Sequence, residues 1–220
     1  MNGYFITGTD TEAGKTRVSL ALMDYLKNKG NSVAGMKPIA SGANWHKGAL
    51  INDDAMLLQR NGSQEFSYNI INPFVYEMPV SPHIAAEVTS ESIDFDRISE
   101  CLSFLQAASD WVIVEGVGGW LVPLGNGLDI SDLAKALKLP VIVVVAIRLG
   151  CINHARLTLK AIADSGVATA GWVANIMQPE MLEQQKNIQT ISEYSEIPLL
   201  GVVPFSSDPD NEDFAQYLSL

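Results

Sequence analysis

The stretch GTDTEAGKT, residues 8–16, ends like a phosphate-binding loop, whose usual spacing is G-x-x-x-x-G-K-[ST]. That spacing would place the first glycine at position 9, but this chain has Thr9 there and Gly8 one position earlier. An apolar run, YFIT at 4–7, precedes the stretch, and an amphipathic helical pattern follows it. Because a phosphate loop stands between a strand and a helix, this context favours a phosphate loop with one extra residue over a plain turn with a surface lysine.

The end of this loop predicts how a nucleotide would be held. Backbone N–H groups at the helix start, together with the positive end of the helix dipole, would bind the β-phosphate. Lys15 would reach the β- and γ-oxygens, and the Thr16 hydroxyl would ligate Mg²⁺. We expect all four side chains of residues 9–12 to face the ligand. ATPases of the partition and nitrogenase-reductase type carry a second lysine in this loop, where the counterpart here is Asp10, and this difference counts against that class.

Composition and charge narrow the class of protein. The 220 residues fit one α/β domain, 1–220, and the net charge of −11 predicts no nucleic acid and no anionic membrane as a partner. Two cysteines, far apart and outside any CxxC pattern, indicate neither a zinc site nor a disulfide framework. We expect no signal peptide, and the apolar run at 141–147 is too short to span a bilayer. These features predict a cytoplasmic protein.

Short apolar runs alternate with helical patterns along the whole chain, which predicts βαβ units and a mostly parallel sheet flanked by helices. The fold class is therefore α/β, resembling the P-loop NTPases, in a single domain. The predicted strands are 4–7, 32–36, 111–114, 140–146, 170–174 and 199–203. The predicted helices are 15–29, 53–60, 95–108, 130–137, 153–164 and 181–194. The segment 61–92, with three prolines, is expected to form loops and short helices beside the site.

Acidic residues at two strand or helix ends are candidate metal ligands. Glu115 follows the apolar run WVIV and precedes GVGG, and a buried carboxylate at a strand end is costly without a cation or partner. The alternative is a structural acid at a turn. Asp53 and Asp54 open a helix, where Asp53 could serve as the N-cap and leave Asp54 free. Because Mg²⁺ takes one or two carboxylates with waters and phosphate oxygens, Asp54 and Glu115 are predicted to join the Thr16 hydroxyl.

A second lysine is predicted to lie near the phosphates. Lys37 ends the second strand in GMKPIASG, at the same sheet edge as Lys15, although a solvated lysine at a strand end remains an alternative. Ser41 and Gly42 then form a small polar turn.

The stretch RLGCINHA, residues 148–155, is a third candidate anion site. A helix expected to begin near Asn153 could hold a carboxylate with its free N–H groups, or this could be an ordinary strand-to-helix turn. Cys151 and His154 are not predicted to form a nucleophile pair, since no orienting acid is evident.

Taken together, these motifs resemble one enzyme family. GTDTEAGKT, GMKPIASG, the Asp53-Asp54 pair, PVSPHIAA, VEGVGGW, LGCINHA, GWVAN and LLGVVP occur in the order and spacing of dethiobiotin synthetase, the ATP-dependent cyclo-ligase of biotin synthesis. The resemblance runs from position 3 to about 211. The phosphate loop alone is shared with the cobyrinic-acid and CTP-forming amidoligases, whereas its combination with KPIASG and LGCINHA is more specific.

The resemblance implies a reaction. One amine of 7,8-diaminononanoate takes up carbon dioxide to give a carbamate, which attacks the γ-phosphorus of ATP and forms a carbamic–phosphoric anhydride. The second amine then closes the ureido ring and expels phosphate. Mg²⁺ is the implied cofactor, ATP the co-substrate, and a homodimer with shared active sites the implied assembly. The alternatives are a related amidoligase, which would usually need a glutaminase domain, and a nucleotide-dependent switch ATPase without a small-molecule product.

The resemblance also implies roles for particular residues. The catalytic residues are Lys37, Lys15 and Thr11, and the metal ligands are Thr16, Asp54 and Glu115. The implied nucleotide-binding residues are Glu12, Ala13, Gly14, Lys15, Thr16, Arg17, Asp54, Glu115, Gly116, Val117, Gly118, Asn175, Ile176, Pro204, Phe205, Ser206 and Asp210. The implied substrate-binding residues are Thr11, Lys37, Ser41, Gly118 and, from the second subunit, Leu149, Gly150, Cys151 and Asn153.

Two of these assignments concern the adenine. An Asn175 amide could pair with both a donor and an acceptor of a purine edge. The family also places an acidic residue near the nucleotide after the last strand. Asp210 fills that place only with a shift of one residue, because a strict count reaches Asn211.

Overall fold

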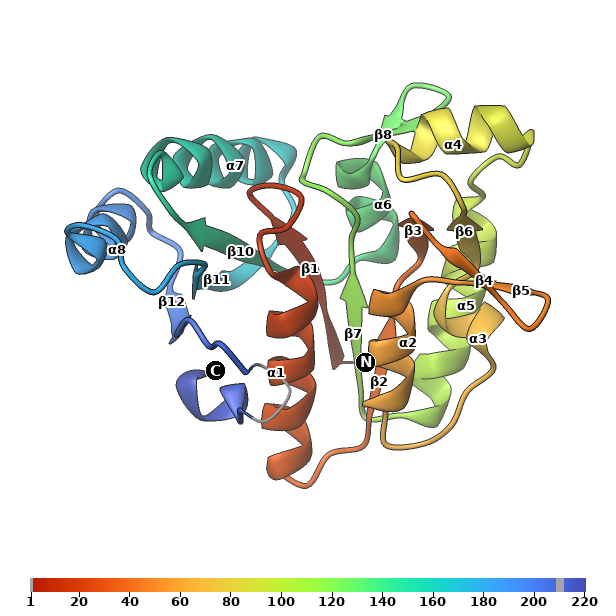
Figure 1. Ribbon diagram of the computed structural model, residues 1–220, viewed down its shortest axis with the longest axis horizontal. Coiled ribbons are helices and arrows are strands. Elements are labelled where there is room, and N and C mark those ends of the chain that lie inside the picture. The colour runs from red at the N-terminus through yellow and green to blue at the C-terminus, as the bar shows by residue number, and fades with distance from the viewer. Residues whose placement is uncertain (1, 209–211) are drawn as a thin grey trace.

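The computed structural model describes residues 2–208 and 212–220, and its centre is a six-stranded parallel sheet (Figure 1). The strand order is β12-β11-β10-β1-β7-β2, and every neighbouring pair is parallel. The strands are β1 (Asn2–Gly8), β2 (Val33–Met36), β7 (Trp111–Glu115), β10 (Val141–Ile147), β11 (Thr169–Ile176) and β12 (Leu199–Val203). The predicted α/β class with a mostly parallel sheet is confirmed, and all six predicted strands form.

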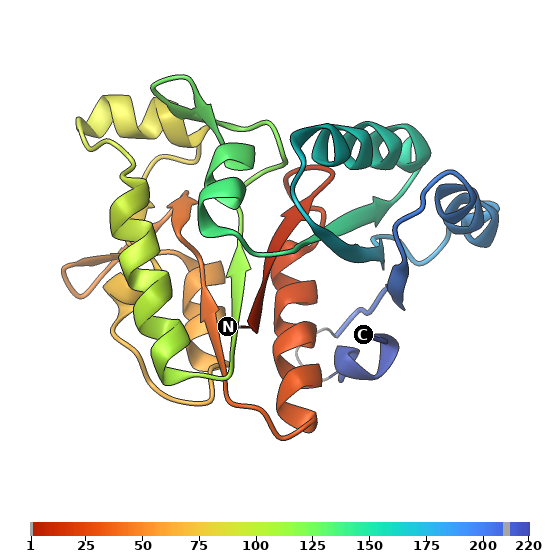
Figure 2. The ribbon, with the colours of Figure 1, turned by 180° about the vertical axis from the view of Figure 1, so that it is seen from behind.

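Helices cover both faces of this sheet. The helices are α1 (Lys15–Asn28), α2 (Asp53–Arg60), α3 (Tyr68–Ile71), α4 (Pro82–Thr89), α5 (Phe95–Ala108), α6 (Ile130–Leu137), α7 (Cys151–Ser165) and α8 (Gln184–Glu193), with a 3-10 helix η2 (Phe214–Tyr217) near the C-terminus. Figure 1 shows α1 and α2 in front of the sheet, and Figure 2, from behind, shows α5, α6 and α7 on the other face. Among the described residues, no helix combines the length and apolarity that crossing a membrane requires.

Side chains of successive strand residues pack into two hydrophobic clusters, one on each face. In β1, Phe5 belongs to the cluster under α5, α6 and α7, whereas Ile6 belongs to the cluster under α1 and α2. The same alternation occurs in β10, where Val143 and Val144 point to opposite faces. Both faces are buried because helices cover them, which explains why these strands are continuous apolar runs in the sequence.

The segment 61–92 holds more than the expected loops and short helices. Its strand β6 (Phe74–Tyr76) pairs in parallel with β3 (Ile39–Ser41), the short strand that follows β2 in the chain. Two short hairpins, β4 (Asn44–His46) with β5 (Ala49–Ile51) and β8 (Pro123–Gly125) with β9 (Leu128–Asp129), were also not predicted. Strands of two or three residues are too short to show an alternating pattern in the sequence.

Helix α2 has the predicted bounds, but its cap is not the expected residue, and α7 begins earlier than predicted. The N-cap of α2 is Asn52, whose side chain accepts a hydrogen bond from the Ala55 N–H at 3.2 Å, so the prediction that Asp53 caps this helix was wrong. Asn is as good an N-cap as Asp, and capping by Asn52 leaves both Asp53 and Asp54 in the first turn of the helix. Helix α7 begins at Cys151 instead of near Asn153, after Gly150 with a φ of 92°.

Candidate active site

The loop after β1 has the conformation that its glycines allow. Gly14 has a φ of 86° and is the N-cap of α1, a backbone conformation that favours glycine. A Cβ on Gly14 would lie 1.9 Å from Nδ2 of Asn175, so a side chain is excluded there by packing as well. The strand–loop–helix context of the sequence motif is confirmed, and the loop points its backbone at the carboxyl edge of the sheet, where ligands bind in such folds.

Only half of the four loop side chains face the site. Residues 11 and 12 line its cavity, as expected. Thr9 instead accepts a hydrogen bond from the Ala146 N–H through Oγ1 at 3.4 Å, and Asp10 pairs with Arg148 at 2.5 Å. For Thr9 and Asp10 the prediction was wrong, because the end of the neighbouring strand β10 offers these side chains an N–H donor and a guanidinium.

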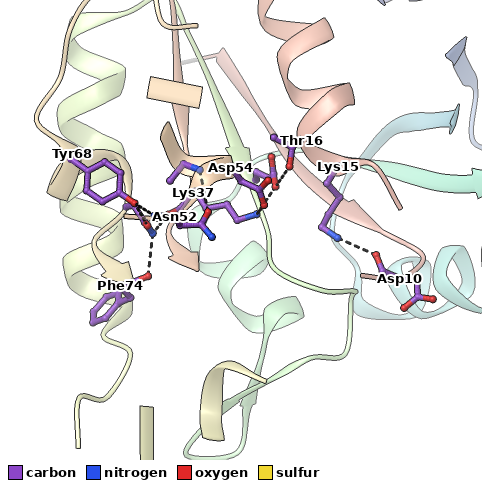
Figure 3. A network of polar contacts seen from close by, with 11 residues as sticks. Asp10, Lys15, Thr16, Lys37, Asn52, Asp54, Tyr68 and Phe74 are labelled. Carbon is purple, nitrogen blue, oxygen red and sulfur yellow. Dashed lines mark hydrogen bonds and ion pairs between the residues drawn. The ribbon is translucent and has the colours of Figure 1, made fainter. Parts of the chain in front are cut away.

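A buried cluster of one lysine, two acids and one hydroxyl lies beside this loop; we call Thr16, Lys37, Asp54 and Glu115 the acid–lysine cluster. Lys37 Nζ donates to Asp54 Oδ2 at 2.8 Å and to Glu115 Oε1 at 2.5 Å. Thr16 Oγ1 donates to the same Glu115 oxygen at 3.0 Å. Lys37 is 4% exposed and Glu115 0%, so this is a desolvated network rather than a surface ion pair (Figure 3).

The ends of four elements build the cluster. Lys37 directly follows β2, Glu115 is the last residue of β7, and Thr16 lies in the first turn of α1. Because β2 and β7 are parallel neighbours, their carboxyl ends meet at the same edge of the sheet. Asp54 comes from the first turn of α2, which Asn52 caps.

The charges of the cluster support one another. Burial opposes the charge of Lys37, but the charges of Glu115 and Asp54 outweigh it and raise the pKa of the ammonium. Burial also opposes the charge of Asp54, yet the charge and the hydrogen bond of Lys37 lower the pKa of that carboxyl. Lys37 and Asp54 are therefore both charged near neutral pH.

Lys15 is less well compensated. Burial and then the charge of Lys37 lower its pKa to about 8, against the acids Glu115, Asp54 and Asp10. Its Nζ donates to the Asp10 backbone carbonyl at 3.0 Å. An anion bound at Lys15 Nζ would therefore be stabilised more strongly than an anion at a lysine that already has a carboxylate partner.

One cavity of about 280 Å³ brings together all the residues predicted to be catalytic or to ligate the metal. Its lining consists of Thr11, Glu12, Gly14, Lys15, Thr16, Lys37, Ser41, Asn52, Asp54, Glu115, Val117 and Gly118. Ser41 Oγ is buried and has no hydrogen-bond partner among the described residues, so it can serve a ligand. Asn52 was missed by the sequence analysis. Its position directly before the acidic helix start was the signal that could have identified it.

The oxygens of the cluster fit a magnesium ion that shares its shell with a nucleotide. Glu115 Oε2 is buried and, within the described part of the chain, has no hydrogen-bond partner. No group of three His, Cys, Asp or Glu converges within residues 2–208 and 212–220. Two carboxylates and the Thr16 hydroxyl are what Mg²⁺ uses when waters and phosphate oxygens complete its octahedron.

Asn175 packs under the phosphate loop. It is fully buried, and its Nδ2 donates to the Ala13 carbonyl at 2.9 Å and to Met177 Sδ at 3.0 Å. Its Oδ1 has no partner among the described residues. The pairing of Asn175 with a purine stays a prediction, with the acceptor oxygen as the atom still available. Asp210 and Asn211 lie outside the described residues.

The loop at 149–153 does not reach this cavity in one chain. Leu149, Gly150 and Asn153 line a different cavity, of about 810 Å³, beside α7. Cys151 is buried, and its Sγ donates a hydrogen bond to Asn187 Oδ1 at 3.9 Å.

Known proteins resemble this chain over nearly its whole length. A family model described as an AAA domain matches residues 2–213. The chain is 46% identical to the ATP-dependent dethiobiotin synthetase of Aromatoleum aromaticum, over 99% of this chain and 96% of that protein. It is 41% identical to the corresponding enzyme of Escherichia coli K12, over 99% and 97% of the two chains.

Solved structures resemble its fold. The MinD cell division protein of Aquifex aeolicus is 15% identical with a TM-score of 0.60, over 99% of this chain and 87% of that one. MinD of Pyrococcus horikoshii, solved with Mg-ADP, is 15% identical with a TM-score of 0.59, over 98% and 92%. At this identity the likeness shows a shared P-loop NTPase fold and nothing about activity.

Proposed function

The chain belongs to the dethiobiotin synthetase family, and on that premise we propose how its acid–lysine cluster takes part in the reaction. It is an ATP-dependent ligase that forms dethiobiotin. The proposed substrates are 7,8-diaminononanoate and carbon dioxide. The observation that carries the mechanism is the buried Lys37, which lies between two carboxylates and in one cavity with Lys15.

Charge neutralisation is the main task of this site. A carbamate and a triphosphate are both anions, and they must meet in line for the carbamate oxygen to attack the γ-phosphorus while ADP leaves. Lys15 and Lys37 provide two positive charges in a water-poor cavity, where fixed charges stabilise a transition state strongly. The second amine then attacks the carbonyl carbon, loses a proton, and displaces phosphate to close the ring.

The side chains around the lysines suit binding and orientation. Thr11 and Ser41 line the same cavity, and the unpartnered Ser41 hydroxyl supports a contact with the amine or carbamate. Holding the reacting groups in place converts a bimolecular step into an effectively unimolecular one. We assign Thr11 and Lys37 to the carbamate, and Lys15 to the phosphates.

Mg²⁺ belongs to the proposal. The Thr16 hydroxyl and the carboxylates of Asp54 and Glu115 would hold it, and the ion would neutralise charge on the β- and γ-phosphates. The unpartnered Glu115 Oε2 supports this assignment.

The remaining nucleotide and substrate contacts are also proposals. Residues 12–17 of the loop region, Gly116–Gly118 after β7, Asn175 with Ile176, and Pro204–Ser206 after β12 all lie at or near the carboxyl ends of strands or the start of α1. That common placement supports their assignment to one nucleotide.

A homodimer with shared sites is the proposed assembly. Its support is the separation of Leu149–Asn153 from the phosphate cavity, together with the 94% exposure of Leu149. The free N–H groups at the start of α7 would hold the tail carboxylate of the partner's substrate. The cytoplasmic location expected from the sequence stays a prediction.

Product analysis tests the function. The protein is incubated with Mg-ATP, bicarbonate and 7,8-diaminononanoate, and dethiobiotin is sought by mass spectrometry, with each component omitted in turn as a control. We expect dethiobiotin and ADP in equal amounts. Steady ATP hydrolysis without dethiobiotin would contradict the proposal and favour a switch ATPase of the kind that shares this fold.

A further inference from the structure

Arg17 joins three segments that are far apart in the sequence. It lies in the first turn of α1, directly after Thr16, and its Cζ stands 4.6 Å from the centroid of the Phe214 ring. One of its nitrogens, Nη1, donates to the Pro204 carbonyl at 3.4 Å. We call Arg17, the Phe214 ring and the Pro204 carbonyl the Arg17 platform. It ties the exit of β12 and the start of η2 to the helix that follows the phosphate loop.

A second cavity connects this platform to the acid–lysine cluster. The cavity measures about 510 Å³, and its lining includes Arg17, Phe214 and Glu212 together with Thr16 and Asp54. Its size lies in the range of small-molecule sites. A nucleotide with its β-phosphate at the start of α1 must extend its sugar and base away from Lys15. This cavity offers space that begins at the phosphate end and passes the platform.

Planarity makes Arg17 suited to a base. A guanidinium is flat, stays charged, and stacks on aromatic rings through both of its faces. Arg17 Cζ lies over the Phe214 ring, and the hydrogen bond to Pro204 restrains rotation of the group. Among the described residues, Phe214 is the only aromatic side chain that lines this cavity.

We propose that Arg17 is a selectivity-determining residue, on whose guanidinium the nucleotide base stacks opposite Phe214. The inference rests on the proposed function only in that a nucleoside triphosphate occupies the phosphate loop. A purine has a larger ring face than a pyrimidine, so this stack favours ATP over CTP. The same contact closes the C-terminal segment onto the base, because Phe214 belongs to η2.

The experiment compares ATP and CTP binding to three variants. Arg17→Gln removes the charge and most of the stacking face, and Arg17→Lys keeps the charge without a planar group. Arg60→Gln removes another cation that lines the same cavity. Dissociation constants for both nucleotides with Mg²⁺ are measured by calorimetry, and KM and kcat for dethiobiotin formation are measured beside them. Folding is checked by circular dichroism and thermal midpoint.

For Arg17→Gln we expect ATP binding to weaken about 3- to 10-fold, the range of a partly desolvated cation–π contact, and the ATP:CTP preference to fall. Arg17→Lys should also lower the ATP:CTP preference while it keeps CTP affinity. The loss should appear in KM more than in kcat, and Arg60→Gln should leave the preference unchanged.

Other outcomes overturn the inference. Equal losses for ATP and CTP in Arg17→Gln, with full rescue in Arg17→Lys, would mean that Arg17 only attracts phosphate. Unchanged constants in Arg17→Gln would mean that the platform is a contact of the fold alone. If Arg17→Gln does not fold, the result for Arg17→Lys decides in the same way. Because the binding constants need no product, a shifted preference in a protein that makes no dethiobiotin would sink the proposed reaction and leave this inference standing.

Discussion

At the scale of single residues, Lys37 combines a role in stability with a proposed role in the reaction. It balances the fully buried Glu115 and the partly buried Asp54, and it is also proposed to carry charge in the reaction. Removing one partner of a buried pair leaves the other charge without compensation, which costs more than the pair contributes. The structure therefore predicts that Lys37 affects stability as well as turnover.

Lys37→Met should lower the free energy of unfolding by about 3–5 kcal/mol, because Glu115 stays buried and unpaired. Turnover should fall by about 100-fold or more, as for other fixed charges that stabilise a transition state. Chemical denaturation and product formation measure the two effects. The double variant Lys37→Met/Glu115→Gln is the control, since it should recover much of the stability and none of the turnover. If Lys37→Met unfolded at the same denaturant concentration as the wild-type protein, the ion pair between Lys37 and Glu115 would not be stabilising.

Lys15 predicts a pH effect on nucleotide binding. Its folded pKa of about 8 lies below its usual value of 10.5, so its burial costs stability below pH 8, and this cost declines as pH rises toward 10.5. A bound triphosphate favours the ammonium form. Above pH 8 ATP binding should therefore take up protons, roughly 0.7 per molecule at pH 8.5, and affinity should fall as pH rises.

Calorimetry of ATP binding in two buffers of different ionisation enthalpy measures this uptake. The same titration at pH 7.5 is the control and should show a smaller uptake. Equal heats in both buffers at pH 8.5 would contradict the lowered pKa of Lys15.

At the scale of elements, α2 carries the proposed metal ligand Asp54 in its first turn, where helices fray most easily. The helix is only 8 residues long, and its start depends on the side-chain cap from Asn52 to Ala55. The backbone N–H of Asn52 also donates to the Tyr68 hydroxyl at 2.8 Å, which ties this start to α3 (Figure 3). The position of the Asp54 carboxylate therefore depends on the cap from Asn52.

Asn52→Ala should cost about 1 kcal/mol of stability, the usual value of a lost N-cap. It should also raise the Mg²⁺ concentration for half-maximal activity, because the first turn of α2 carries Asp54. Asp94→Ala is the matched control, since Asp94 caps α5 through Asp96 N–H on the other face of the sheet. It should cost similar stability without changing the Mg²⁺ midpoint, and Asn52→Ser should restore both values. An unchanged midpoint in Asn52→Ala would show that the cap does not position Asp54.

At the scale of the whole molecule, the proposed dimer decides which residues meet. In one chain the start of α7 opens to a cavity beside α8, whereas Lys37 and Lys15 line the phosphate cavity. Asn153 could therefore act at the phosphate cavity only when it comes from a second chain. Shared sites therefore predict complementation between two inactive chains.

The two chains are Lys37→Met/Glu115→Gln and Asn153→Glu, whose new carboxylate would repel the substrate tail. In a mixed dimer one site carries both defects and the other carries neither. Mixing the variants after mild dissociation should therefore restore up to about a quarter of wild-type activity, since half the dimers are mixed and half their sites intact. Each variant dissociated and reassociated alone is the control. No recovery, with mixed dimers confirmed by mass, would place the whole site within one subunit.

The sequence by itself determined the strands of the central sheet and the phosphate loop, because continuous apolar runs and a Gly-Lys-Thr helix start are local patterns. It also predicted that Lys37 lies at the same sheet edge as Lys15, since parallel strands end together. Tertiary structure alone decided that Asp10 turns to Arg148. It alone placed Lys37 between two carboxylates and Arg17 on Phe214. These contacts join segments up to 197 positions apart, and their distances depend on how helices pack on the sheet, which no local pattern records.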